Sequence, residues 1–130
     1  MAGSAYYNLT DGEKDYVKSH PWNAAIISWN KEVAVDETVR RFGKNGHNDS
    51  SDAFRHCFWS ALLARDIGAA DAKEFTDLHE SSPLNPIREK TMDIHNNKIG
   101  ISIGSKGGSD GSISEACYKA LTGGKLKVIK

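Results

Sequence analysis

The chain has 130 residues, which fits a single domain that can fold without disulfides or a structural metal. Lysine plus arginine and aspartate plus glutamate both number 17, so the formal net charge is zero. This balance argues against a partner held by bulk charge, such as duplex DNA or an anionic bilayer, although it allows a nuclease with a local basic groove.

Helical signals begin near the start of the chain. Thr10 and Glu13 form a capping-box pattern that predicts a short helix to about residue 18. Residues 21–42 open on a proline, which favours a first helical position, and carry apolar side chains at helical spacing. They are predicted to form one long amphipathic helix, with Gly43 as its C-terminal stop.

Four further helices are predicted, at about 51–67, 69–80, 86–100 and 112–121. Asp49, Ser50 or Ser51 supplies the cap of the first of these, and Ser112 begins a second capping-box pattern. A break at residues 81–86 contains two prolines, with an asparagine as the expected cap and the second proline as the first helical residue.

The C-terminal tail, residues 125–130, mixes lysine with apolar residues and is predicted to be a short strand or a docked tail. The pattern as a whole predicts an all-α fold, a compact bundle of five or six helices forming one domain over residues 1–130. Residues 1–4 read as a start added by an expression vector, and neither a signal peptide nor a transmembrane segment is expected. Cys57 and Cys117 are expected to be two buried thiols, with a long-range disulfide as the alternative.

The first polar cluster lies just inside the predicted helix 51–67. Asp52 and His56 are one turn apart and share a face, so the carboxylate can orient the imidazole for acid/base chemistry or metal binding. Arg55 lies on an adjacent stripe with Trp59. A capping aspartate, a stacked arginine and a satisfied histidine would explain the same residues without a function.

The second cluster is the pair His79 and Glu80, at the end of the next helix. Adjacent helical residues point about 100° apart, so the two side chains cannot bind one atom without a bend. A histidine near a helix C-terminus also interacts favourably with the helix dipole, which is a structural explanation for the pair.

The third cluster is Asp93, His95, Asn96 and Asn97. Asparagine is a poor residue inside a helix, so two in succession beside an aspartate indicate hydrogen bonds to something outside the helix. His95 shares a stripe with apolar residues and could equally be a satisfied core histidine.

The three clusters fall on consecutive helices joined by short breaks, and such helices usually pack side by side. We therefore expect one polar site, with His47 and Asn48 of the preceding loop closing the same pocket. The catalytic candidates are Asp52, Arg55, His56, His79, Glu80, Asp93, Asn96 and Asn97. The candidates for substrate binding are His47, Asn48, Trp59 and His95. A divalent ion (Zn²⁺, Mg²⁺ or Ca²⁺) is allowed, with His56, His79 and Asp93 as its ligands, and so is a metal-free acid/base pair.

The segment HNDSSDAFRHCFWSALLARDIG, the His-Glu pair and the segment MDIHNNKIG together resemble an uncharacterised domain family. Its members stand at the C-termini of bacterial Rhs/YD-repeat and related polymorphic toxins. The resemblance spans about residues 10–126 and is strongest over 48–100. It implies a toxin or effector module that is secreted or delivered into a target bacterial cell as the C-terminal part of a larger protein. A cognate immunity protein is the implied partner.

The sequence supports two hypotheses about function. The first is a toxin hydrolase, with or without a metal, that cleaves a phosphoester in lipid, cell envelope or nucleic acid; a metal-independent RNase-type nuclease is one variant. The second is a non-enzymatic binding module with a buried polar network. Burying so many polar groups is costly, which favours the first. Zero net charge favours a lipid or envelope substrate over nucleic acid.

Overall fold

The computed structural model describes residues 9–81 and 85–130, and within these ranges the chain forms six helices and no strand. The helices are α2 (Asp11–Ser19), α3 (Pro21–Phe42), α4 (Ser50–Ile67), α5 (Ala69–His79), α6 (Ile87–Gly104) and α7 (Asp110–Thr122). The all-α fold predicted from the sequence is confirmed. The expected vector-derived start and the centre of the break at 82–84 lie outside the described residues.

Side chains at the helix ends explain most of these boundaries. The Thr10 hydroxyl accepts a hydrogen bond from the Glu13 backbone N–H, and the Glu13 carboxylate accepts one from the Thr10 N–H, which completes the predicted capping box. Asp49 caps α4 by accepting from the backbone N–H of Asp52 at 3.0 Å. Gly43 ends α3 with a φ of 70°, a left-handed conformation that favours glycine.

Three predicted boundaries were wrong. Helix α6 continues past Gly100 to Gly104, because Gly100 is a point of close contact with α4 and not a stop. Helix α7 begins at Asp110, two residues before Ser112, because Ser109 provides the cap by accepting from the Ser112 N–H. Pro86 also stands outside α6, at its N-cap position, so the helix begins one residue later than expected.

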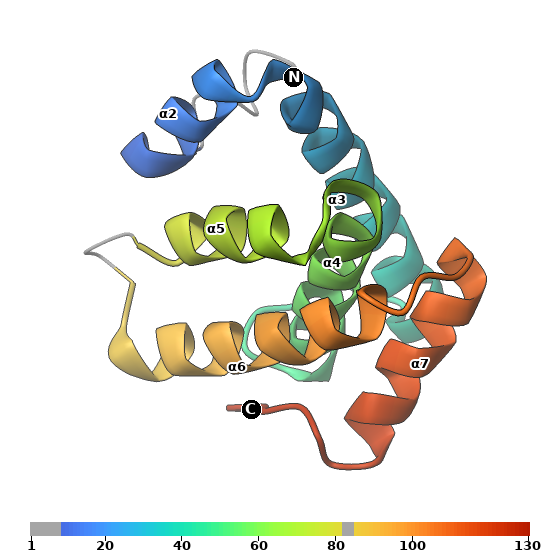
Figure 1. Ribbon diagram of the computed structural model, residues 1–130. Coiled ribbons are helices and arrows are strands. Elements are labelled where there is room, and N and C mark those ends of the chain that lie inside the picture. The colour runs from blue at the N-terminus through green and yellow to red at the C-terminus, as the bar shows by residue number, and fades with distance from the viewer. Residues whose placement is uncertain (1–8, 82–84) are drawn as a thin grey trace.

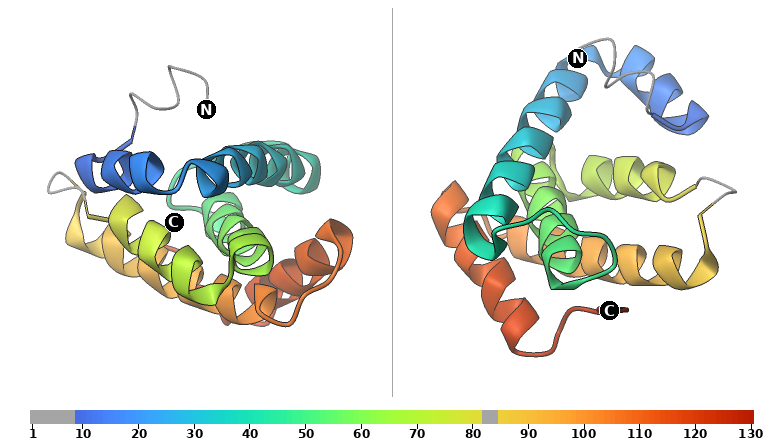
Figure 2. Two further views of the ribbon diagram at one scale, coloured as in Figure 1. Left: turned by 45° about the horizontal axis from the view of Figure 1, so that its top comes forward. Right: turned by 180° about the vertical axis from the view of Figure 1, so that it is seen from behind.

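Helix α4 is the centre of the molecule. It packs against α3, α5, α6 and α7, and α2 covers the far side of α5 (Figures 1 and 2). Apolar side chains of α4 are the largest contributors to the core, and the fully or almost fully buried ones are Phe54, Phe58, Leu62 and Leu63. Because α4 is buried on nearly every face, its polar residues Asp52 and His56 must also be buried.

Helices α4 and α6 approach each other at the backbone. A Cβ atom on Gly100 would lie 2.1 Å from the carbonyl oxygen of Cys57, and one on Gly104 would lie 1.9 Å from that of Ala61. Real Cβ atoms do not come this close, so only glycine allows the contact. The close approach brings Asp93 and Asn97 of α6 to the polar end of α4.

The tail beyond α7 is docked along α6 (Figure 1). The buried Asn96 side chain donates to the Lys127 carbonyl at 2.9 Å and accepts from the Lys127 N–H at 2.8 Å. Further on, the backbone N–H groups of Ile129 and Lys130 donate to the Asn48 carbonyl. Of the two forms expected for the tail, the docked one is therefore correct.

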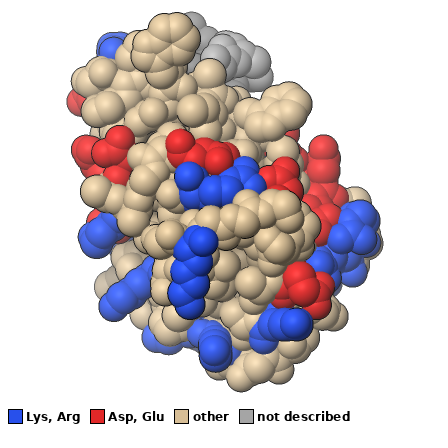
Figure 3. All heavy atoms as spheres, turned by 45° about the vertical axis from the view of Figure 1, so that its right-hand side comes forward, with Lys and Arg blue, Asp and Glu red and all other residues tan. Residues whose placement is uncertain are grey.

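Cys57 and Cys117 are buried free thiols, as expected, and the alternative disulfide is not formed. No helix in the described parts of the chain is both long enough and apolar enough to cross a membrane. Acidic and basic side chains are interspersed on the face shown in Figure 3, in keeping with the zero net charge.

Candidate active site

The three polar clusters converge around one side chain, the buried His56. Its Nε2 atom lies 3.3 Å from Asp52 Oδ1 and 3.5 Å from Asp93 Oδ1. Its Nδ1 atom lies 3.3 Å from Asn97 Oδ1 and 3.9 Å from Glu80 Oε2. Side chains from all three clusters therefore meet in space, with contributions from α4, from the end of α5 and from α6.

Asp52 is held by more than His56. One carboxylate oxygen accepts from the Asn48 backbone N–H at 2.7 Å, and the other is bound by the Arg55 guanidinium. Arg55 also donates to Asn45 and Gly46 of the loop before α4. Asp52 and Arg55 therefore fix the loop to the first turn of α4 and orient His56.

Asn97 links α6 to the other two helices. Its carbonyl oxygen accepts from the Ser60 hydroxyl at 3.0 Å, and its amide nitrogen lies 3.5 Å from the Glu80 carboxylate. Glu80, only 3% exposed, also accepts from Asn85 at 3.2 Å. His79 and Glu80 face different groups, as adjacent residues at a helix end do.

His79 has its own carboxylate partner on α2. Its Nδ1 atom lies 2.8 Å from Glu13 Oε2, and Glu13 is 1% exposed. The His79 ring stands edge-on to Trp59, with centroids 5.4 Å apart, and 6.4 Å from the His56 ring. Since Nδ1 is bound to Glu13, Nε2 is the His79 nitrogen left for a ligand.

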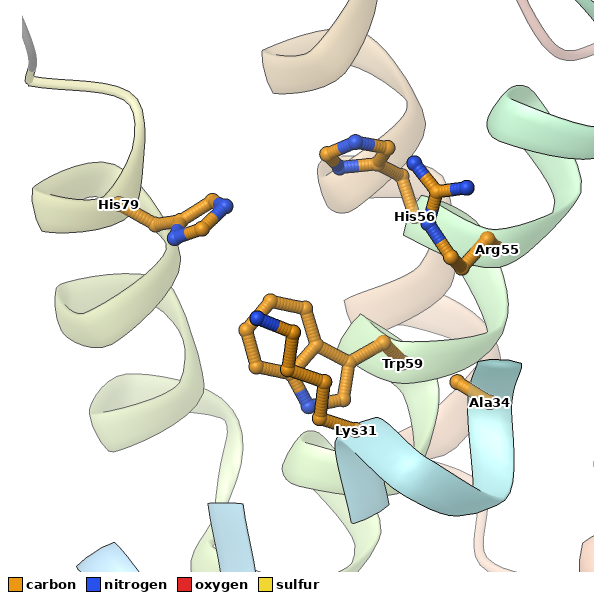
Figure 4. Close-up of a pocket in the computed structure, with 6 residues that line it drawn as sticks. All are labelled: Lys31, Ala34, Arg55, His56, Trp59 and His79. Carbon is orange, nitrogen blue, oxygen red and sulfur yellow. The ribbon is translucent and has the colours of Figure 1, made fainter. Parts of the chain in front are cut away.

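A pocket of about 140 Å³ opens between α3, α4 and α5, and Figure 4 shows the side chains around it. It is lined by Lys31, Ala34, Arg55, His56, Trp59 and His79. The Lys31 ammonium lies over the Trp59 ring, 5.8 Å from its centroid. The polar groups that line the pocket are all nitrogen groups, whereas the carboxylates lie behind them.

The buried charges shift one another's pKa values. Burial lowers the pKa of His56, but the hydrogen bond with Asp52 and the charge of Asp93 outweigh it, so the pKa of His56 is raised. Burial raises the pKa of Asp52, but His56, the Asn48 N–H and Arg55 together outweigh burial, so the pKa of Asp52 is lowered. For Asp93, burial and two nearby carboxylates raise the pKa to about 6 despite His56. The three carboxyl groups around His56 therefore carry more negative charge than His56 and Arg55 can balance.

The Glu13–His79 pair predicts an acid-sensitive contribution to stability. Burial raises the pKa of Glu13, but His79 and Thr10 together lower it by a larger amount. The pKa in the folded protein therefore lies below its ordinary value of 4.5. Stabilisation by a lowered carboxyl pKa is fully present above pH 4.5 and is lost as the pH falls below that value. Glu13→Gln, which keeps the cap acceptor, should therefore cost about 1–3 kcal/mol at neutral pH and progressively less in acid.

Urea unfolding of wild type and Glu13→Gln across the acidic range checks this prediction. Asp15→Asn, at an exposed position on the same helix, is the matched control and should show no such pH-dependent difference. A Glu13→Gln deficit that stays constant with pH would contradict the assigned ion pair.

His47 and Asn48 differ in how closely they join the site. Asn48 is buried, and its side-chain amide donates to Glu89 at 2.7 Å while its backbone N–H binds Asp52. Its φ of 62° is in the left-handed region, which the Asp52 and tail contacts stabilise. The His47 side chain is 71% exposed, binds Glu89, and lies 3.8 Å from Asp52. Both residues close the side of the cluster away from the pocket.

His95 and Asn96 do not join the cluster, which corrects their predicted roles. His95 Nε2 lies 2.8 Å from the Lys125 carbonyl, and both polar atoms of Asn96 bind the Lys127 backbone. Asn96 does form the hydrogen bonds outside its helix that the sequence indicated, but its partner is the C-terminal tail. The reason is rotation, since Asn96 points about 100° away from Asn97 around α6.

Asn96→Ala should release the tail and leave the site intact. Removing the amide leaves the Lys127 N–H and carbonyl without their side-chain partner, at a cost of about 1–3 kcal/mol. Amide hydrogen exchange at Lys127 should become much faster, while ligand binding in the pocket stays as in wild type. Slow exchange at Lys127 in the variant would contradict the docking contact.

Metal ligands were predicted as His56, His79 and Asp93. The carboxylate and imidazole atoms that come together are instead those of Asp52, His56 and Asp93, which all lie within 4.8 Å of one another. His79 is absent from this set among the described residues, and its ring centroid lies 6.4 Å from that of His56. Asp52 thus replaces His79 as the third candidate ligand.

Three residues of the site were missed by the sequence analysis. Ser60 is one turn after His56 on the same face of α4, so helical spacing could have found it. Glu13 was assigned only to the capping box, which uses one of its two oxygens. Lys31 carries no local signal, because it reaches the pocket only through the packing of α3 on α4.

Comparison with known proteins finds one matched region, which contains every residue of the site except Glu13. A family model described as "Domain of unknown function (DUF6973)" matches residues 14–125, which is most of the chain. No solved structure matches the chain.

Proposed function

Since the chain belongs to the DUF6973 family, a domain of unknown function, we propose its activity from the site itself: it hydrolyses a phosphoester. The substrate class is a phosphodiester or phosphomonoester of lipid, cell envelope or nucleic acid. The observation that carries the proposal is the pocket in which Lys31, Arg55 and two histidines face a common space of about 140 Å³.

The pocket suits an anion. Lys31 and Arg55 bring cationic side chains to it, and His79 offers Nε2, the ring nitrogen that Glu13 does not bind. The rings of His56 and His79 are 6.4 Å apart, a gap that accommodates one tetrahedral phosphoryl group between them. Trp59 forms an apolar wall on which an attached base, sugar or lipid headgroup could pack.

The two histidines are supported differently, which assigns them different roles. His56 lies among Asp52, Asp93 and Glu80, so the cluster takes the proton of the attacking water. The new bond joins the water oxygen to phosphorus. The phosphorus–oxygen bond to the leaving group breaks with its electron pair, and His79 donates the proton that the leaving oxygen needs. Glu13 holds the His79 ring in place for this step.

Arg55 stabilises the charge that develops on the phosphoryl oxygens, and Lys31 attracts the anion in substrate and transition state alike. Arg55 is held by Asp52 and the loop before α4, so it is already positioned before a substrate arrives. Lys31 is exposed and comes from a different helix, so it can follow the substrate. Preorganised cations of this kind contribute most when charge grows in the transition state.

The biological setting is proposed from the resemblance to terminal domains of polymorphic toxins. The domain would be the C-terminal part of a larger delivery protein, would act inside a target bacterial cell, and would be neutralised by a cognate immunity protein. The interspersed charges on the face in Figure 3 favour a lipid or envelope phosphoester over a long nucleic acid.

Expression in a bacterial host without an immunity partner tests the toxin part. The wild-type chain should arrest growth, and His56→Ala at an equal expression level should not. Growth arrest by both proteins would favour the non-enzymatic binding module. Growth with both would contradict the toxin assignment in that host.

Lys31→Gln tests whether Lys31 helps the pocket to bind an anionic substrate. Removing this cation should lower kcat/KM for a phosphodiester by about 10-fold, mostly through KM, because the lysine contacts substrate and transition state alike. Thermal stability should not change, since the side chain is exposed. Lys18→Gln, at an exposed position on α2, is the matched control. Equal kinetics of Lys31→Gln and wild type would remove Lys31 from the site.

A further inference from the structure

The protonation of His56 is constrained by Asn97. The Asn97 amide nitrogen lies next to the Glu80 carboxylate, which only accepts, so the Asn97 oxygen is the atom that faces His56 Nδ1. The Ser60 hydroxyl donates to the same oxygen. Because that oxygen also only accepts, Nδ1 carries the ring proton and donates it to Asn97.

The other ring nitrogen, Nε2, then faces two carboxylates. Asp52 Oδ1 is 3.3 Å away and Asp93 Oδ1 is 3.5 Å away. A nitrogen lone pair and two carboxylate oxygens repel one another unless a positive species lies between them. That species is either a second proton on the ring or a metal ion, since both occupy the same position.

Two buried acceptors nearby have no hydrogen-bond partner among the described residues. One is Asp93 Oδ1 itself, and the other is Asn48 Oδ1. Both residues are only 9% exposed. Asn48 is next to the cluster, because its backbone N–H binds Asp52. Buried oxygens are rarely left unpaired, and unpaired ones beside a histidine and carboxylates indicate a cation.

We propose that a divalent transition-metal ion, Zn²⁺ or Mn²⁺, binds Asp52 Oδ1, His56 Nε2 and Asp93 Oδ1. A tetrahedral ion with bonds of about 2.0–2.1 Å separates its ligand atoms by about 3.3–3.4 Å. The two separations from His56 Nε2 agree with this geometry, and one ligand atom from each of the three residues lies within 4.8 Å of the other two. One imidazole with two carboxylates suits these ions better than a soft metal.

The surroundings match those of metal sites in other proteins. A ligating histidine usually donates its second N–H to a carbonyl or carboxylate, as Nδ1 does here to Asn97. Asp52 is likewise fixed by Arg55 and by the Asn48 N–H. Three protein ligands leave a position for water, and one of the ligand residues, His56, also lines the pocket.

The role of the ion rests on the proposed hydrolase function, but its binding does not. A bound ion of this class would supply hydroxide near neutral pH, and the cluster would hold that nucleophile near the cationic side chains of Lys31 and Arg55. Binding can be measured without any substrate, so the two ideas can fail separately.

Calorimetric titration of metal-free protein with Zn²⁺ and with Mn²⁺ tests the site. Wild type should bind one ion per chain, with a rise in Tm, and Asp93→Asn should lose affinity by about 100-fold or more. Asp77→Asn, an exposed position on α5, should bind as wild type does. No binding by wild type, or equal binding by Asp93→Asn, would overturn the site.

Anomalous scattering from a Zn²⁺-soaked wild-type crystal keeps the test independent of variant folding. The ion should lie about 2.0–2.2 Å from the three named atoms. A peak elsewhere, for example at His47 or His95, would overturn the assignment. Phosphoester turnover that persists in metal-free protein would overturn the role of the ion and leave the hydrolase function intact. Metal binding without any turnover would leave the metal site intact and overturn the hydrolase function.

Discussion

Replacing His56 with glutamine should lower phosphoester turnover by about 10²–10⁴-fold, the usual contribution of one group that transfers a proton or holds a catalytic ion. Glutamine can retain a hydrogen bond to Asn97 but can neither accept a proton at this position nor bind a metal well. Because His56 is buried among carboxylates, the variant should also lose about 1–3 kcal/mol of stability. Activity measured well below the reduced Tm separates the two effects.

His95→Gln is the matched control for this prediction. His95 is the same residue type on α6, but it binds the carbonyl of the tail and does not reach the cluster. It should keep wild-type turnover. If His56→Gln were fully active and His95→Gln were not, the assignment of the two histidines would be reversed. A folded and fully active His56→Gln would end the proposal for His56.

Gly104→Ala adds one methyl group and should lower the free energy of unfolding by a large amount. Its Cβ atom would lie 1.9 Å from the backbone carbonyl of Ala61, and backbone cannot move aside as a flexible side chain can. Adding a methylene to a packed core typically costs about 1–3 kcal/mol, and we expect about 3 kcal/mol or more here. Helix α6 must shift away from α4, which also moves Asp93 and Asn97 away from His56.

Urea unfolding measures the loss, and Gly111→Ala is the control. A Cβ on Gly111 meets nothing within 4 Å, and the residue lies in the first turn of α7. Alanine is the better helix former by about 1 kcal/mol, so this variant should be as stable as wild type or more so. Equal stability of Gly104→Ala and Gly111→Ala would contradict the close approach of α4 and α6.

Most of the helices could be predicted from the sequence, because their ends depend on local chemistry. Thr10 with Glu13, Asp49 and Gly43 act within one turn of their own helix, so spacing alone identifies them. Gly100 misled the prediction because its role is not local. It looks like a helix stop in the sequence, whereas its actual function is contact with a helix about forty residues earlier.

The same distinction applies to the site. The i, i+4 spacing of Asp52 and His56 fixes their relative position within one helix, so the pair was predictable. Lys31 reaches the pocket and Glu13 reaches His79 through helix packing, which no short pattern encodes. The adjacent Asn96 and Asn97 show the limit most clearly. Both were correctly expected to bind outside their helix, but the choice between the tail and the active site depends on the tertiary fold.

The hydrolysis of a phosphoester in the α3–α4–α5 pocket is tested most directly by turnover of bis(p-nitrophenyl) phosphate, a phospholipid and an RNA oligonucleotide with purified protein. Metal-free protein and protein supplied with Zn²⁺ or Mn²⁺ should both be assayed. We predict that wild type cleaves at least one of these phosphodiesters and that His79→Gln, which lacks the proposed proton donor beside Trp59, loses most of that activity. No cleavage of any of them by folded wild type, or equal cleavage by wild type and His79→Gln, would contradict the proposed hydrolytic site.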